Sequence, residues 1–509
     1  MSRNTVIFII FLIVISTPFA LLDYAHFPYS DGAEHGAAVR ALAEDMLHPG
    51  DPILNGISGG SPRYVPSILV MALVMRLFPV DVLVILKLFL IIYFTLFLVS
   101  AGLFSSEYFN DPGQAAWSIA FLLFFWGLGW TGSNAYMFSA TLYTAYYPSV
   151  VAFSSALLAL YLQLRFMRSK QQGLLAAAIA VGALSFANHP VTGIFFLVCS
   201  ALLYLGQEGL NKKTVFCFAL TIAGALCLTA LWPYYSFWAA FKRVAAGDMQ
   251  NTMDYNLTRE YLYSTPLLRA GPALIGIPIV IFYFTQRRYL LLWGGCAVFG
   301  FIYLAGYFVT ISLAERFIFF IMCLLQLASS RLVKEWLAAA SFPGMNLKKI
   351  ATVLLTGALA GGGALQSVLV FQEFIYPGFS FASGSLFPQY TNPNALQNEL
   401  KQYLGPGDIV LSDIYSSWSV PVYTGAKIVA LFHASPHIQD NIQRIADVEA
   451  FYSTSTPNAV RSEIVRKYGV THILLHLRIN GKQLEPVLQK MGYTEVAHTD
   501  LFCIFSVSK

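Results

Sequence analysis

The chain has 509 residues, of which 57% are hydrophobic and only 11% are charged. Soluble globular proteins carry about 25% charged residues, so this composition excludes an ordinary soluble enzyme. The net charge of +5 is small, and the basic residues lie in short clusters between apolar runs. This distribution reflects membrane topology and argues against nucleic-acid binding.

Apolar runs of about 20 residues recur through the first three quarters of the chain, and each is long enough to cross a hydrocarbon core. The first run is interpreted as an uncleaved span rather than a signal peptide, because many spans follow it. Residues 66–78 are apolar but short and contain Arg76, so they are expected to form a surface helix or a partial insertion. The pattern predicts about eleven spans, at residues 5–22, 80–104, 115–130, 141–166, 173–188, 190–206, 214–233, 267–285, 289–310, 315–333 and 350–370.

Basic residues between the spans predict the orientation. If the N-terminus is cytoplasmic, all four basic clusters fall on the cytoplasmic side, as the positive-inside rule requires. Residues 23–65, residues 234–266 and the tail are then outside, in a bacterial-type inner membrane. The clusters are Arg165, Arg168 and Lys170; Lys212 and Lys213; Arg287 and Arg288; and Arg331, Lys334, Lys348 and Lys349.

The C-terminal quarter has a soluble composition. We expect residues 1–372 to form the membrane module and residues 373–509 an extracytoplasmic α/β domain. The tail contains neither a Gly-rich phosphate loop nor metal-ligand spacing, and it has a single cysteine, Cys503. Helix-like stretches alternate in it with short apolar runs: Leu396–Leu404, Ala459–Tyr468 and Lys482–Met491 as helices, and Ile409–Leu411, Ile428–Leu431, His472–Leu475 and Phe502–Val507 as strands.

The first outer loop, 23–65, carries six of the 26 acidic residues of the chain. A helix that starts near Asp31 places Asp31, Glu34 and His35 on one face, at positions i, i+3 and i+4. Carboxylates beside a histidine suit a general base, with or without a divalent metal. The alternative is a helix cap by Asp31, with Glu34 completing a capping box.

Charged residues within or near the membrane-spanning segments are the second indication of a functional site, because burying charge in a membrane is costly and such residues usually serve function. Glu315 and Arg316 begin the tenth predicted span at the outer face. An arginine at this level is suited to an anionic lipid phosphate. The alternative is a local ion pair or an interfacial anchor.

Further candidates for substrate binding lie at other span ends. His189 lies between two closely spaced spans, where capping or packing is the alternative to a substrate contact. Tyr147 precedes Pro148 at the opening of the fourth span, a level at which tyrosines commonly form an interfacial belt. Arg243 and Arg259 lie in loop 234–266, which fits a headgroup- or sugar-binding loop and an ordinary solvated loop equally well.

Together these features resemble the GT-C fold glycosyltransferases that use a polyprenyl-phosphate sugar. One span is followed at once by an acidic outer loop, Ser30-Asp31-Gly32-Ala33-Glu34-His35. Tyr147-Pro148-Ser149 opens the fourth span, Glu315-Arg316-Phe317 starts a late span, and an α/β tail follows. The similarity extends over essentially the whole chain, and architecture carries more of it than any motif.

The resemblance implies sugar transfer from a polyprenyl-phosphate donor in the membrane to a hydroxyl of a glycan, lipid or protein. Asp31 would act as general base, assisted by Glu34, and Arg316 would lie near the phosphate. The reaction could be metal-independent or use a divalent ion, Mg²⁺ or Mn²⁺, for which Asp31, Glu34 and His35 are the candidate ligands. Many members carry a second acidic residue in the next outer loop, which here, at 131–140, has none.

Two other functions compete with this interpretation. A flippase or transporter of lipid-linked sugars would be expected to show internal repeats and charges at mid-membrane, and neither is evident in the sequence. A non-catalytic cell-envelope assembly protein, whose tail binds partners, would leave the acids of the first loop without a role.

Overall fold

A computed structural model describes the chain except for residues 22–27, 29–30, 58–59, 128–133, 240–241, 243–258, 265, 310, 340–360, 363, 366–367, 369–398, 432–437, 478–481 and 508–509. The chain divides into two compact units. The first comprises residues 1–22, 87–232 and 257–383, and the second comprises residues 23–86, 233–256 and 384–509. The second unit therefore unites the first loop with the tail.

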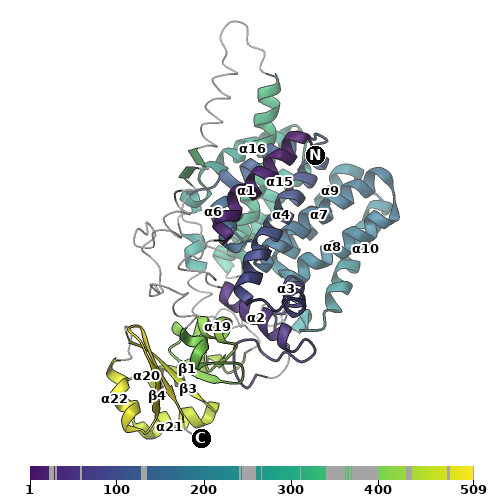
Figure 1. Cartoon of the computed structure of the whole chain (residues 1–509). Coiled ribbons are helices and arrows are strands. Elements are labelled where there is room, and N and C mark those ends of the chain that lie inside the picture. The colour runs from purple at the N-terminus through teal and green to yellow at the C-terminus, as the bar shows by residue number, and fades with distance from the viewer. Residues whose placement is uncertain are drawn as a thin grey trace. The chain divides into compact units, whose positions relative to one another are not determined.

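The first unit is a bundle of helices (Figure 1). Within the described residues, six helices are long and apolar enough to cross a membrane, and several shorter apolar helices accompany them. A chain with this many apolar helices is a multi-pass membrane protein. The elements are α1 (Arg3–Leu21), α4 (Val82–Tyr108), α5 (Gln114–Phe124), α6 (Phe138–Thr144), α7 (Pro148–Ser169), α8 (Gln172–Asn188), α9 (Pro190–Glu208), α10 (Lys212–Ala230), α13 (Pro266–Ala270), η2 (Gly271–Ile275), α14 (Gly276–Thr285), α15 (Leu290–Val309), η3 (Ala314–Phe317) and α16 (Ile318–Ala339).

Most of the predicted spans coincide with helices, although their number and orientation stay predictions. The stretch 141–166 is divided, because Pro148 begins α7 and separates it from the short helix α6. Residues 66–78 form a separate 12-residue helix, α3 (Pro66–Leu77). The last predicted span, 350–370, lies almost entirely outside the described residues.

Buried polar side chains join helices of the bundle. The Gln163 amide on α7 donates to Ser200 Oγ on α9 at 2.7 Å. The Gln114 amide on α5 donates to Ser330 Oγ on α16 at 3.0 Å, and the Gln326 amide donates to the carbonyl of Phe125 at 2.8 Å. Such bonds hold helices together where lipid offers polar groups no other partner.

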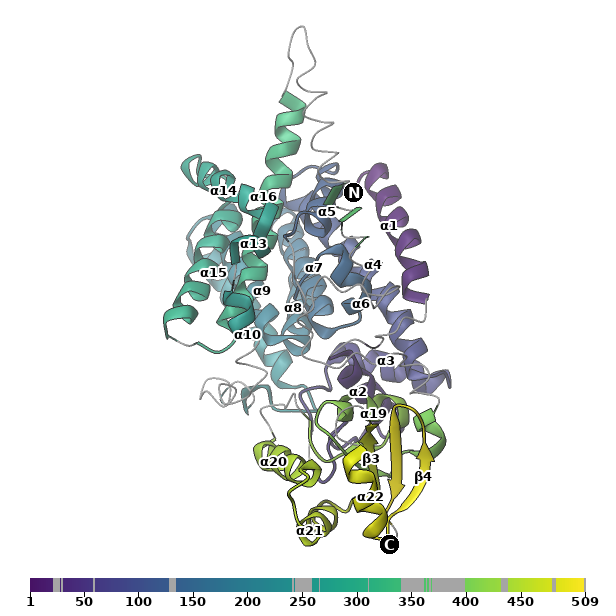
Figure 2. The same ribbon diagram turned by 90° about the vertical axis from the view of Figure 1, so that its left-hand side faces the viewer.

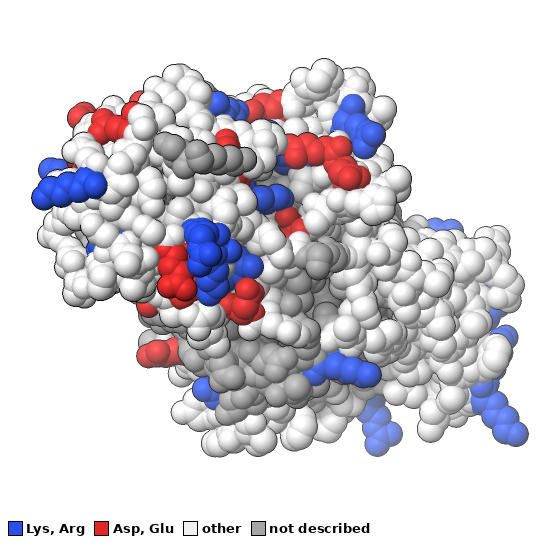
Figure 3. Space-filling model, turned by 90° about the horizontal axis from the view of Figure 1, so that it is seen from below, with Lys and Arg blue, Asp and Glu red and all other residues white. Residues whose placement is uncertain are grey.

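The basic clusters pair with acids at the helix ends. Arg168 contacts Glu107 at 2.6 Å, and Lys334 contacts Asp111 at 2.5 Å. Glu107 and Asp111 therefore lie beside residues that the sequence assigned to the cytoplasmic side. Uncharged surface extends over much of the molecule, while acidic and basic side chains intermingle in one region (Figure 3).

The second unit contains a five-stranded sheet in the order β2-β1-β3-β5-β4. Strands β2, β1 and β3 are parallel, whereas β5 is antiparallel to both β3 and β4. Helices of the tail lie beside the sheet (Figures 1 and 2). The strands are β1 (Ile409–Ser412), β2 (Lys427–Ile428), β3 (His472–His476), β4 (Thr494–His498) and β5 (Phe502–Ser506), and the helices are α2 (Gly32–Glu44), α3, η4 (Ser416–Ser419), α19 (Val420–Thr424), α20 (Asn441–Tyr452), α21 (Asn458–Tyr468) and α22 (Lys482–Lys490).

The first loop is built into this sheet. Leu54 forms a parallel bridge with Ile428 on the edge strand β2, and the Ile428 N–H donates to the carbonyl of Ile53 at 2.9 Å. Ile53, Leu54 and Ala37 of α2 share one hydrophobic core with Val410, Ile428, Leu474 and Ile504 of the strands. The loop and the tail thus fold as one body.

Helix α2 packs closely against α19. Gly36 makes this approach possible, because a Cβ at this position would collide with Val422. The Arg40 guanidinium donates to the carbonyl of Val422 at 3.1 Å. Helix α2 is therefore held by backbone and side-chain contacts to the tail.

A partly exposed ion pair also joins the first segment to the tail, because Lys401 Nζ lies 2.5 Å from Asp81 Oδ2. Burial alone would raise the pKa of Asp81, but the bond from Lys401 and the Leu83 N–H outweigh it and lower the pKa. A lowered carboxyl pKa contributes stability that is present above about pH 4 and is lost as pH falls through the folded-state value.

The wild-type protein should therefore lose more stability on acidification than the Asp81→Asn variant does. The difference should be less than about 1 kcal/mol, because the ion pair is partly solvated. Hydrogen exchange of α3 and residues 399–403, compared between pH 7 and pH 3, measures the difference. Asp500→Asn, at an exposed turn residue, is the control. An identical acid response in the Asp81 and Asp500 variants would exclude this contribution.

Candidate active site

The candidate general base stands at the beginning of α2. Asp31 occupies the N-cap position, and its backbone carbonyl accepts the His35 N–H at 3.0 Å, but its side chain makes no capping hydrogen bond. Asp31 and His35 lie one helical turn apart, on the same side of α2, and both are partly exposed. The capping alternative for the Asp31 side chain is therefore not what the structure shows.

Glu34 has a different environment from Asp31. Its carboxylate is 3% exposed and receives the Arg63 Nε–H at 2.6 Å, with a second contact from Nη2 of the same guanidinium. Arg63 follows 29 residues later and is itself mostly buried. No pattern in the sequence indicated this pairing, which arises from the folding of the loop.

Other acidic residues of the loop also attract the Arg63 cation. Burial alone would lower the pKa of Arg63, but attraction by Glu34, Asp51 and Asp31 outweighs it, and the pKa is raised. Asp51 is itself fixed, because its Oδ1 accepts the N–H groups of Ile53 and Leu54 at 2.9 and 2.8 Å. Asp31 and the Arg63 guanidinium thus attract each other.

The tyrosines of the second unit brace the loop that carries Arg63. The Tyr64 hydroxyl donates to the carbonyl of Gly50 at 2.8 Å, and its ring lies 5.8 Å from that of Tyr234. The Tyr234 hydroxyl in turn donates to the carbonyl of Met46 at 3.0 Å, just after α2. Both ends of the loop are therefore fixed around α2.

In the first unit, Glu315 and Arg316 lie on η3, directly before α16. The backbone enters this turn through Leu313 in a left-handed conformation, with φ of 66°. Glu315 is fully buried, and neither of its carboxylate oxygens has a hydrogen-bond partner among the described residues. Among the described residues, Glu315 and Arg316 therefore do not form the local ion pair that the sequence offered as an alternative. A buried carboxylate without a partner is costly, so this position calls for a functional explanation.

Two other candidates have local structural roles. His189 caps α9, because its Nδ1 accepts the Thr192 N–H at 3.3 Å and lies 2.8 Å from Thr192 Oγ1. Arg259 donates to the carbonyls of Gly306 and Tyr307 at 3.4 and 3.2 Å, in the last turn of α15. A cation at a helix C-terminus satisfies carbonyls that lack helical partners.

Tyr147 and Arg243 complete the set of candidates. Tyr147 is the N-cap of α7, and its side chain is buried and packs edge-on against Tyr146 with ring centroids 5.0 Å apart. Its burial within the bundle distinguishes it from a lipid-facing belt tyrosine. Arg243 lies outside the described residues.

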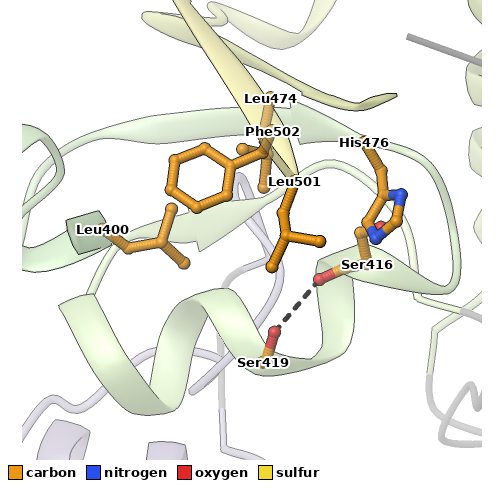
Figure 4. Close-up of a pocket in the computed structure, with 7 residues that line it drawn as sticks. All are labelled: Leu400, Ser416, Ser419, Leu474, His476, Leu501 and Phe502. Carbon is orange, nitrogen blue, oxygen red and sulfur yellow. Dashed lines mark hydrogen bonds between the residues drawn. The ribbon is translucent and has the colours of Figure 1, made fainter. Parts of the chain in front are cut away.

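A small pocket lies at the carboxyl ends of β1 and β3, with about 290 Å³ of space that is partly open to solvent. Ligands of open α/β sheets bind at such ends, where the strand order reverses. Here leucine and phenylalanine side chains fill most of the wall, and the imidazole of His476 stands beside Ser416 (Figure 4). Because most of this space is open to solvent or too narrow for a water molecule, the pocket is far smaller than a ligand site, and we assign no ligand to it.

No protein-family model and no curated protein matches the chain. Solved structures do match it. The apo structure of ArnT from Cupriavidus metallidurans aligns with a TM-score of 0.59 and 12% identity, over 99% of this chain and 98% of ArnT.

Two further structures align over the whole of this chain at 12% identity. The oligosaccharyltransferase AglB from Archaeoglobus fulgidus, in complex with an inhibitory peptide and a dolichol-phosphate, gives a TM-score of 0.51 over 74% of AglB. The mycobacterial arabinofuranosyltransferase AftD gives 0.57 over 42% of AftD. The chain therefore has the GT-C fold, and the expectation from the sequence resemblance is confirmed.

Proposed function

We propose that this chain is a membrane glycosyltransferase that transfers a sugar from a polyprenyl-phosphate donor to an acceptor hydroxyl. One observation carries the proposal: the chain has the GT-C fold, and the loop helix that follows its first helix begins with a partly exposed carboxylate, Asp31. Solved proteins of the same fold include an oligosaccharyltransferase with bound dolichol-phosphate and an arabinofuranosyltransferase.

In the proposed reaction, the Asp31 carboxylate takes the proton of the acceptor hydroxyl while the hydroxyl oxygen attacks the anomeric carbon. The bond between that carbon and the phosphate oxygen breaks, and its electron pair leaves with polyprenyl phosphate. Attack from the opposite side inverts the anomeric centre. A positioned base contributes about 10²–10⁴-fold to such a step.

The negative charge that develops on the leaving phosphate requires a cation. We assign this role to Arg316, whose side chain is partly exposed and whose Nε has no partner among the described residues. A guanidinium presents several donors in one plane and matches a phosphate well. Glu315, buried beside it, is proposed to accept a hydrogen bond from a hydroxyl of the donor sugar.

The ligand set at α2 does not suit a divalent metal. Glu34 is occupied by Arg63, a cation that competes directly with a metal ion for the carboxylate. Octahedral Mg²⁺ or Mn²⁺ sites need several oxygen ligands, and the loop 131–140 contributes no acid. A related structure, the A. fulgidus oligosaccharyltransferase, was obtained with zinc and sulfate. For this chain we assign no step to a metal.

The proposed setting is a bacterial-type inner membrane with a cytoplasmic N-terminus. The first loop and the tail then lie on the extracytoplasmic side, where glycan, lipid or protein acceptors are available. The test is transfer from synthetic polyprenyl-phosphate sugars by the purified protein in liposomes, with released polyprenyl phosphate measured by mass spectrometry. Absence of release from every donor, by a correctly folded protein, would favour the flippase or the non-catalytic assembly role.

Arg316→Ala is expected to weaken donor affinity about 10-fold or more, because one charge-assisted bond to the phosphate is lost. Arg316→Lys should retain part of the affinity through its charge. Equilibrium binding of a labelled polyprenyl-phosphate sugar measures both variants. Arg287→Ala, at an exposed arginine, is the matched control. Equal affinities of the Arg316 and Arg287 variants would refute the phosphate role.

A further inference from the structure

Three side chains with metal-binding atoms converge on one face of the β4–β5 hairpin. They are Glu495 and His498 of β4 and Cys503 of β5, and their ligand atoms all lie within 4.8 Å of one another. A fourth, Glu485 of α22, places its carboxylate 4.0 Å from His498 Nδ1. These residues are 18 positions apart at most in the sequence, but no regular motif links them.

The hairpin backbone explains the convergence. His498 and Cys503 are directly paired across the strands, and Glu495 is paired with Phe505. A register shift between Glu495 and Ala497 brings Glu495 to the same face as His498. Without this irregularity, residues three apart on one strand would point to opposite faces.

The distances suit a small tetrahedral ion. Bonds of about 2.0–2.3 Å to nitrogen, oxygen and sulfur imply ligand separations of about 3.3–3.8 Å in a tetrahedral zinc site. Glu495 Oε1 already lies 3.3 Å from His498 Nδ1. The other separations among Glu495, His498 and Cys503 are at most 4.8 Å and must shorten by about 1 Å, which the exposed Glu495 and His498 side chains can supply by changing rotamer.

The chemistry of the ligands narrows the choice of ion. A thiolate and an imidazole favour zinc over magnesium, calcium or manganese. The alternative without a metal is an ion pair of His498 with Glu495 and Glu485, together with a hydrogen bond between the Cys503 thiol and Glu495, and metal binding distinguishes the two.

We propose that Glu485, Glu495, His498 and Cys503 form a zinc site that joins β4, β5 and α22. On binding, the Cys503 thiol gives up its proton to solvent and the sulfur bonds the ion, while the imidazole and carboxylates bind through lone pairs. The ion fastens the exposed edge strand β4 to its neighbours. This site is independent of the proposed transferase activity.

Cobalt titration of the purified, tag-free protein tests the site, because tetrahedral Co²⁺ bound to a thiolate gives a charge-transfer band. One equivalent of Co²⁺ should produce the band, and Zn²⁺ should abolish it. His498→Gln and Glu495→Gln, at exposed positions, should weaken binding at least 10-fold, and Cys503→Ser should remove the band.

Two variants serve as controls. His472→Gln alters another histidine of the same sheet, which lies 3.3 Å from Asp408, and Cys227→Ser removes an exposed cysteine of α10. Both should retain the band. Absence of the band from the wild-type protein, or its persistence after Cys503→Ser and His498→Gln, would overturn the proposal.

Discussion

Asp31→Asn is expected to lower the rate of sugar transfer by about 100- to 10,000-fold while leaving the fold intact. The amide has nearly the shape of the carboxylate but cannot accept the proton of the attacking hydroxyl. Asparagine is also a favoured residue at a helix N-cap, so the substitution should not destabilise α2. Single-turnover transfer from a polyprenyl-phosphate sugar measures the effect on chemistry apart from donor binding.

Glu44→Gln is the matched control for this substitution. Glu44 is an exposed carboxylate at the other end of the same helix, and its loss is expected to leave transfer unchanged. Thermal unfolding of both variants should match that of the wild-type protein. If Asp31→Asn transfers sugar at the wild-type rate, another group must serve as the base.

Arg63→Met is expected to destabilise the second unit by about 3–5 kcal/mol. The substitution keeps most of the side-chain volume but leaves the Glu34 carboxylate buried at 3% exposure without its cation. The double variant Glu34→Gln/Arg63→Met removes the uncompensated charge, so it should lose less stability than Arg63→Met alone. Hydrogen exchange of α2 and the strands measures the stability of each variant. A double-mutant cycle built from these values gives the coupling energy between Glu34 and Arg63.

Arg76→Ala separates this effect from a general loss of positive charge, because Arg76 is exposed on α3 of the same unit. Its stability should remain within about 0.5 kcal/mol of wild type. A double variant as unstable as Arg63→Met would mean that Arg63 acts through contacts other than Glu34.

Much of the fold follows from local patterns in the sequence. The apolar runs gave helices close to their predicted positions, and the predicted strands at Ile409, His472 and Phe502 are confirmed within a residue or two. Strand β4 escaped prediction because four of its five residues are exposed, so it lacks an alternating apolar face. Pro148 divides a predicted span because its ring starts a helix more readily than it continues one.

The surroundings of the candidate site depend on contacts that no local pattern contains. The acids at Asp31 and Glu34 were visible in the sequence, but the choice of Arg63 as the partner of Glu34 arises from the folding of the loop between them. The pairing of Leu54 with Ile428 could not be predicted either, because no sequence pattern near one residue indicates the other.

The shared core of the first loop and the tail also sets an order for biosynthesis. Arg40 and its acceptor Val422 are 382 positions apart, so at about 5–20 residues per second the ribosome makes them roughly 20–75 s apart. Throughout that interval α2 lacks the apolar surface against which Ala37 and Leu54 are finally buried. A chain whose translation stops before residue 422 therefore carries Asp31 but lacks the tail contacts that hold α2.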